Sequence, residues 1–276
     1  MKKEASAIVV NLILAVTLLL PLVVVAQNKA DLYNSGVEHV RARRWQQAAD
    51  VLKQAAAEDP KDGDVLFQLG YAYHQLGQFA EAVKYLKQAT DLNPDDSEAT
   101  YWLALSHSAI GQHDKAVVAY QETVRLKPDD ADAHTDLGVA FTYLKNYNDA
   151  IKAFQRAVSL QPKNAMAYFH LGFAQMASKQ THAAMESYKE ASRLDPTLAG
   201  PQVNLAAVYN TLGRHAEALK AAQSGLKLNP KSAIGHYQLA MAYLKSGQIQ
   251  EARAEQRLLK QLNPELAQQL QRLLPK

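Results

Sequence analysis

The segment Gly63–Asp96 reads GDVLFQLGYAYHQLGQFAEAVKYLKQATDLNPDD, and its pattern recurs along most of the chain in steps of 34 residues. A ladder of prolines has this step: Pro60, Pro94, Pro128, Pro162, Pro196, Pro230 and Pro264. A ladder of alanines lies twelve residues earlier: Ala48, Ala82, Ala116, Ala150, Ala184, Ala218 and Ala252. Such a period is typical of stacked-repeat proteins. We therefore expect seven repeats, at residues 29–62, 63–96, 97–130, 131–164, 165–198, 199–232 and 233–266.

Each repeat is predicted to form two helices joined by a turn. The first helix of the quoted segment has its core stripe at Leu66, Leu69, Gly70 and Tyr73, and the second at Ala82, Leu86 and Ala89. These spacings place each set on one helical face. Gly77 marks the turn, since glycine readily adopts the positive φ that ends a helix. Pro94 disfavours helix at the residue before it, so the second helix is expected to end there.

This combination of spacing, small residues, aromatic residues and prolines resembles the tetratricopeptide repeat family over residues 29–266. The resemblance implies an all-α fold, a right-handed superhelical α-solenoid of seven 34-residue units. The first and last repeats depart most from the pattern. The first has Ser35 where the others have leucine and His39 at the usual tyrosine position, and the last has Gln256 at an aromatic position. Residues 265–276 are expected to form a capping helix and tail, with Leu266, Leu270 and Leu273 covering the last repeat.

Overall composition excludes several classes of function. Lysine and arginine total 30 against 27 acidic side chains, and no basic stripe indicates a nucleic-acid partner. There are no cysteines, which excludes disulfides and thiolate metal sites. The balance of charge and apolar residues predicts a folded protein rather than a disordered one.

The N-terminus is predicted to be an export signal. Lys2 and Lys3 precede an apolar run over residues 8–26, whose helical length of about 28 Å approaches the bilayer core of about 30 Å. Pro21 and the run Val24-Val25-Ala26 favour a signal peptide, residues 1–26, cleaved before Gln27. An uncleaved membrane anchor over residues 8–26 is the alternative, and would be the protein's only contact with a membrane. Either case predicts an exported protein, in a bacterial periplasm or at the cell surface.

No sequence motif indicates an enzyme. There is no phosphate-binding glycine loop, no His-Glu-x-x-His helix and no nucleophile elbow. His39, His74 and His107 lie near the ends of successive predicted helices, but at positions 11, 12 and 11, so their side chains point in different directions. We therefore expect no catalytic residues, no cofactor and no metal site.

Candidate binding residues lie on the first helix of each repeat, at positions 2, 5, 6, 9, 12 and 13, opposite the core stripe. The resemblance implies that this face lines a concave groove that holds an extended peptide. The candidates are Tyr33, Asn34, Phe67, Gln68, Tyr71, Tyr101, Trp102, Asp136, Phe169, His170, Phe173, Asn204, Tyr237 and Gln238. Aromatic residues on an exposed face are typical of binding hot spots. The alternative is that several of these rings pack against the next repeat.

The amides Asn34, Gln68, Asn204 and Gln238 can both donate and accept hydrogen bonds to a bound backbone. A similar asparagine ladder occurs in the repeats of O-linked sugar transferases, but here Trp102, Asp136 and His170 interrupt it. The two-carboxylate clamp of chaperone adaptors requires lysine or arginine at positions 2, 5 and 6, and this chain has none there. That function is therefore excluded.

The leading hypothesis is a non-catalytic scaffold that binds a protein segment in its groove. The resemblance implies a place in an envelope assembly, secretion or pilus-type complex. A scaffold of polysaccharide export whose aromatic groove contacts glycan is one alternative, and a recruiting module for a separate enzyme is another. Gly200 and Pro201 are interpreted as an ordinary helix start, in preference to a flexible joint.

Overall fold

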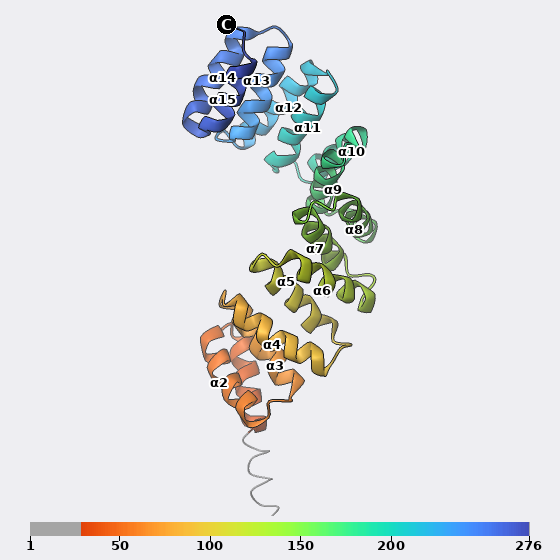
Figure 1. Ribbon diagram of the computed structural model, residues 1–276, viewed down its shortest axis with the longest axis vertical. Helices are drawn as coiled ribbons and strands as arrows, with labels where there is room; N and C mark the ends of the chain where they lie inside the picture. The colour runs from red at the N-terminus through yellow and green to blue at the C-terminus, as the bar shows by residue number, and fades with distance from the viewer. Residues whose placement is uncertain (1–28, 276) are drawn as a thin grey trace, which may run out of the picture. The chain divides into compact units, whose positions relative to one another are not determined.

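The computed structural model describes residues 29–275 (Figure 1). The predicted leader, residues 1–26, lies outside the described residues. The chain divides into two compact units at Pro128, which we call the N-terminal lobe, residues 29–128, and the C-terminal lobe, residues 129–275.

The N-terminal lobe is a run of antiparallel helices. A helix over residues 29–41 is followed by α2 (Trp45–Glu58), α3 (Gly63–Gln75), α4 (Phe79–Leu92), α5 (Ser97–Ala109) and α6 (His113–Leu126). From α2 onward each helix packs against the next, and α3 also contacts α5. The helices of this lobe are therefore stacked in the order of the sequence.

The C-terminal lobe continues the same arrangement. Its helices are α7 (Ala131–Tyr143), α8 (Tyr147–Leu160), α9 (Ala165–Ala177), α10 (Thr181–Leu194), α11 (Ala199–Thr211), α12 (His215–Leu228), α13 (Ala233–Lys245), α14 (Ile249–Leu262) and α15 (Pro264–Leu273). Helices α7, α9, α11 and α13 contact one another in order, and α15 packs on α13 and α14. The all-α, helix-turn-helix fold that the sequence predicts is confirmed.

Helix boundaries follow the 34-residue period. Helices α3, α5, α7, α9, α11 and α13 begin at residues 63, 97, 131, 165, 199 and 233. Every helix that precedes a ladder proline ends two residues before it, and the C-cap residue directly before the proline has φ between −124° and −157°. This is the conformation that a following proline favours. The division into seven repeats remains a prediction that these boundaries agree with.

A third ladder, of helix N-caps, was not predicted. The side chains of Asp62, Asp96, Asp130, Asn164 and Ser232 accept hydrogen bonds of 3.0–3.1 Å from backbone N–H groups in the first turns of α3, α5, α7, α9 and α13. These caps satisfy donors that a helix leaves unpaired at its start. Helix α11 differs, because Leu198 occupies its cap position and offers no acceptor. Gly200 and Pro201 lie in its first turn, as an ordinary helix start requires.

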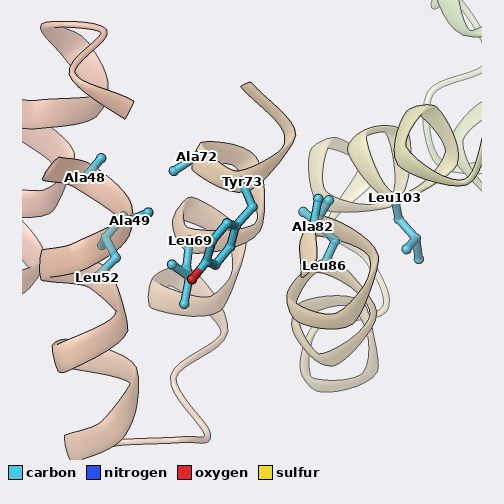
Figure 2. Close-up of a cluster of buried hydrophobic side chains, with 9 residues drawn as sticks. All are labelled: Ala48, Ala49, Leu52, Leu69, Ala72, Tyr73, Ala82, Leu86 and Leu103. Carbon is cyan, nitrogen blue, oxygen red and sulfur yellow. The ribbon is translucent and has the colours of Figure 1, made fainter. Parts of the chain in front are cut away.

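The core is shared between successive helices. Figure 2 shows one such cluster, made by Ala48, Ala49 and Leu52 of α2, Leu69, Ala72 and Tyr73 of α3, Ala82 and Leu86 of α4, and Leu103 of α5. Small residues allow the two helices of a pair to approach closely. A Cβ added at Gly70 would lie 2.6 Å from Leu86 Cγ. No pair of helices thus buries its apolar face alone.

The C-terminal capping helix forms as predicted, but the prediction for Leu273 was wrong. Leu270 is buried and Leu266 half-buried, whereas Leu273 is 50% exposed. Ala267 and Leu274 are buried in its place. At 100° per residue, Ala267, Leu270 and Leu274 fall within about 60° of one another, and Leu273 lies outside that arc, at the edge of the buried face. Within residues 29–275, none of the helices has the length and apolar character needed to span a membrane.

The turns between paired helices contain residues with positive φ. Gly77, Gly111, Gly213 and Gly247 have φ of 73–75°, as the turn prediction expects. The corresponding residues of the other turns are not glycine: Arg43, Lys145 and Lys179 have φ of 55–65°. This left-handed conformation is strained for a residue with a Cβ.

Replacing Lys179 with glycine is expected to raise the free energy of unfolding. Relief of left-handed strain, about 1 kcal/mol, is partly offset by the greater freedom of glycine in the unfolded chain. Gly77→Ala is the reverse case, because its φ is 73° and no neighbouring atom would touch the added methyl group. We expect it to lower the unfolding free energy by about 1 kcal/mol. Urea unfolding measures both, and a destabilised Lys179→Gly variant would contradict the expectation.

Candidate binding groove

An open groove with a volume of 640 Å³ lies in the C-terminal lobe. Side chains from α7, α9, α11 and α13 line it, with the first residue of α8 and residues of the turns before α8 and α13. We call it the C-terminal groove and define it by Val139, Thr142, Tyr143, Lys145, Tyr147, Phe169, His170, Phe173, Ala199, Gly200, Val203, Asn204, Asn229, Ser232 and Ile234.

The groove crosses the helices diagonally. Its lining passes from Tyr143 at the end of α7, through Phe173 in the middle of α9, to Gly200 and Ile234 near the starts of α11 and α13. Its walls are largely apolar and reach solvent, since Tyr143 is 65%, Ile234 56% and Phe173 45% exposed. Apolar side chains gathered at an open surface are typical of an interaction site.

Small side chains on α11 open the groove. Phe169 and Phe173 of α9 occupy the same repeat positions as Phe67 and Tyr71 of α3. In the N-terminal lobe the space beside these α3 rings is occupied by Trp102 of α5, whose ring lies 4.6 Å from that of Tyr71.

The residues of α11 that correspond to Tyr101 and Trp102 are Val203 and Asn204. They cannot reach across to α9 as an indole can. The same face is therefore filled in one lobe and hollow in the other.

Four of the predicted binding residues line the C-terminal groove: Phe169, His170, Phe173 and Asn204. They come from α9 and α11, which pack directly against each other. The structure thus brings this part of the predicted set together. That they bind a partner remains a prediction.

In the N-terminal lobe, the predicted aromatic residues pack as the alternative interpretation describes. Phe67 stacks on Tyr71 at 6.4 Å, Trp102 lies 5.0 Å from His74, and Tyr101 lies 6.0 Å from Tyr120. These rings are half-buried against the helices on either side.

The other predicted residues of this lobe lie apart from one another. Asn34 is exposed and Gln68 half-buried. Tyr33 lines a smaller pocket of 360 Å³ with Lys29, Asp62 and Asp64. This pocket is smaller than the C-terminal groove and has two carboxylates in its lining.

Three predicted residues of the C-terminal lobe lie outside the groove. Tyr237 packs against the cluster formed by α13, α14 and α15. The side-chain oxygen of Gln238 accepts a hydrogen bond of 3.1 Å from Asn210 Nδ2, so this amide is already used within the protein. Asp136 is half-buried on α7.

Some lining residues were missed although the sequence carried a signal. Gly200 and Ile234 are at position 2 of their helices, and Thr142 and Tyr143 are at positions 12 and 13, all of which were predicted to face outward. Glycine, threonine and isoleucine are not typical hot-spot residues, but Tyr143 is, and its outward position was signal enough to select it. Lys145 lies in a turn, where helical periodicity gives no facing direction.

The groove contains little charge. Its lining includes Lys145 and His170 and no aspartate or glutamate. The His170 ring stacks on Phe154 at 5.8 Å, and burial lowers the pKa of His170 below its ordinary value of 6.5. The imidazole is therefore neutral near pH 7. Asn204 Nδ2 donates to the hydroxyl of Tyr188 at 3.2 Å, which fixes the amide at the groove wall.

Two histidines outside the groove, His74 and His107, form hydrogen bonds within the protein. Ser106 Oγ donates to the Trp102 carbonyl at 2.8 Å, so His74 Nδ1 is the donor in its 2.9 Å contact with that hydroxyl. His107 Nδ1 lies 2.9 Å from Gln112 Oε1. Burial lowers the pKa of both rings. Across residues 29–275, no group of three histidine or carboxylate side chains could hold a metal ion.

Comparison with known families gives two matches. A profile described as the C-terminal domain of cilia and flagella-associated protein 70 matches residues 96–274. A tetratricopeptide repeat profile matches residues 39–105. Together they extend over nearly the whole described chain. A search of curated proteins found no match.

Solved structures with a similar fold include three that cover different shares of the chain. MamA 41-end from Desulfovibrio magneticus RS-1 is 28% identical, covers 61% of this chain and 96% of its own, and has a TM-score of 0.57. YrrB, a TPR protein with an unusual peptide-binding site, is 18% identical, covers 68% of this chain and 97% of its own, and has a TM-score of 0.61. A chain of the APC/C hetero-tetramer Cut9–Hcn1 is 21% identical, covers 90% of this chain and 48% of its own, and has a TM-score of 0.62.

The lowered pKa of His170 predicts a loss of stability in mild acid. The unfolded chain, with a histidine pKa near 6.5, takes up a proton more readily than the folded one. The free energy of unfolding is therefore highest above that pH and falls as the pH is lowered toward the folded pKa. Thermal unfolding between about pH 7 and about pH 5 should show this fall, and His170→Gln should reduce it. A His170 ring that titrates above 6.5 in NMR spectra would contradict this account.

Proposed function

Because this chain belongs to the tetratricopeptide repeat family, whose members are helical scaffolds for protein interaction, we propose that its C-terminal groove binds an extended segment of a partner protein. The observation that carries the proposal is the open apolar groove across α7, α9, α11 and α13. The protein then acts by holding its partner and not by catalysis.

The dimensions of the groove suit an extended segment. It runs across four successive first helices, and packed helices lie about 9 Å apart. Three such steps give a path of about 27 Å, which about eight residues of extended chain would fill. A short segment of a partner is therefore enough to occupy the groove from end to end.

The lining offers both kinds of contact that an extended segment needs. Phe169, Phe173 and Ile234 supply apolar surface for side chains of the segment. Asn229 and Ser232 add polar groups near the end of the groove. Amide and hydroxyl groups can bond a backbone in either direction, since each both donates and accepts. Apolar pockets would then provide the specificity.

The proposed place of action is the bacterial cell envelope. Support comes from the sequence of residues 1–26, in which two lysines precede an apolar run and a site suited to signal peptidase. A scaffold exported in this way would serve an assembly, secretion or pilus-type complex. Fractionation of cells followed by N-terminal sequencing tests export and cleavage: an exported protein with Gln27 as first residue is expected. Retention in the cytoplasm would contradict export, and Met1 as first residue would contradict cleavage.

A photoreactive residue placed at position 173 should cross-link to a partner protein in the native envelope. Phe173 is 45% exposed within the groove, whereas Trp102 is enclosed by Tyr71 and His74. Position 102 is therefore the matched control, at which we expect few or no adducts. Asn204→Trp should remove the adducts at position 173, because the indole would fill the groove as Trp102 does in the N-terminal lobe.

Two outcomes would contradict the proposed function. Recovery of glycan alone at position 173 would indicate a carbohydrate-contacting scaffold instead. Adducts that are equally abundant at positions 102 and 173 would show that the groove is not the binding surface. Circular dichroism of each variant checks that the helices remain folded.

A further inference from the structure

We propose that the C-terminal groove selects protein segments in which bulky apolar residues alternate with carboxylates, and that Lys145 binds one of these carboxylates. This inference rests on the proposed function, because it names the chemistry of the segment that the same groove takes. It depends on the groove's charge, its apolar walls and the position of one lysine.

The groove carries positive charge and no negative charge in its lining. Lys145 is the single permanently charged side chain among the described lining residues, and it has no ion-pair partner within residues 29–275. The nearby carboxylate of Asp149 is already bound to Lys152 Nζ at 2.9 Å and to Asn146 Nδ2 at 2.8 Å. The lysine is thus available to a carboxylate from outside the chain.

Acidic residues are also missing from the adjoining helix starts. The first turns of α3, α5 and α7 contain Asp64, Glu98 and Asp132. The first turns of α9, α11 and α13 contain no acidic residue. No negative charge on these turns therefore repels an acidic segment that enters the groove. The pocket of the N-terminal lobe differs, because Asp62 and Asp64 line it and Asp62 pairs with Lys29 at 2.6 Å.

The apolar walls set the other half of the preference. Phe169 and Phe173 form one side, and Val203 and Ile234 continue it toward the starts of α11 and α13. Side chains alternate between the two faces of an extended chain. A segment that alternates apolar and acidic residues would direct its apolar side chains into the groove and its carboxylates toward the exposed rim, where Lys145 lies.

The backbone at Lys145 provides a matched pair of variants. Lys145 and Lys179 both occupy turns with positive φ, at 59° and 65°. Only Lys145 lines the groove. Glycine at either position should relieve strain and raise the Tm, but only Lys145→Gly removes the charge from the groove. Lys145→Gly should therefore raise the stability and weaken the preference for acidic segments. Lys179→Gly should raise the stability and leave that preference unchanged.

The test uses fluorescein-labelled peptides of about nine residues that alternate Phe or Leu with Glu. Peptides with Gln or Lys in place of Glu are the comparators. Fluorescence anisotropy with the protein carrying residues 27–276 should show that the Glu peptide binds about fivefold more tightly than the Gln peptide, with a difference that shrinks in high salt. Lys145→Gly should abolish that preference, Lys179→Gly should retain it, and Lys145→Glu should favour the Lys peptide.

Each remaining outcome overturns a different statement. Equal affinity for the Glu, Gln and Lys peptides would disprove the charge preference and leave the groove as a peptide site. An equal loss of preference in Lys179→Gly would show that Lys145 acts through the turn and not through its charge. Failure of every peptide to bind, in a protein with native circular dichroism, would overturn the proposed function together with this inference.

Discussion

The close contact between a small residue on one helix and a bulky residue on its partner is the constraint on which the structure depends. A Cβ added at Gly138 would lie 2.6 Å from the Phe154 ring, and one added at Gly172 would lie 2.8 Å from that of Tyr188. These contacts press the paired helices together along one face. The opposite face of the first helix is thereby directed outward in each repeat. The extended residue before each proline ends the second helix at the same repeat position, so the next pair begins in the same register.

Given that register, a few sequence differences between the two lobes are enough to open the groove. Helices α3 and α9 present nearly the same aromatic residues outward, but α5 offers Tyr101 and Trp102 where α11 offers Val203 and Asn204. In one lobe the rings fill the space and join the packing of the helices. In the other lobe the aromatic surface of α9 is left uncovered. A repeated scaffold can thus gain a binding site at one place by losing a side chain there.

The all-α fold, the helix ends and the core face of most helices could be predicted from the sequence, because the proline and alanine ladders fix the period. The groove could be predicted only in part. Periodicity placed Phe169, Phe173 and Trp102 on the same face, but whether a ring packs or remains uncovered depends on the residue opposite it on the neighbouring helix. Lys145 could not be found in this way, because it lies in a turn with positive φ where four other turns have glycine. Leu273 was misplaced because the buried face of α15 is centred on Ala267, Leu270 and Leu274 and not on Leu266.

The most direct test of this account is a methyl NMR titration of the folded protein with indole, a ring of the size that Trp102 places beside Tyr71. The account predicts that indole shifts the methyl signals of Val139, Val203 and Ile234, which line the C-terminal groove. The signals of Leu105, on the equivalent face of α5 in the N-terminal lobe, should stay unchanged because native rings already fill the space there. Equal shifts at Leu105 and Val203, or no shift at Val203, would contradict the claim that small residues on α11 open an aromatic-sized groove in the C-terminal lobe.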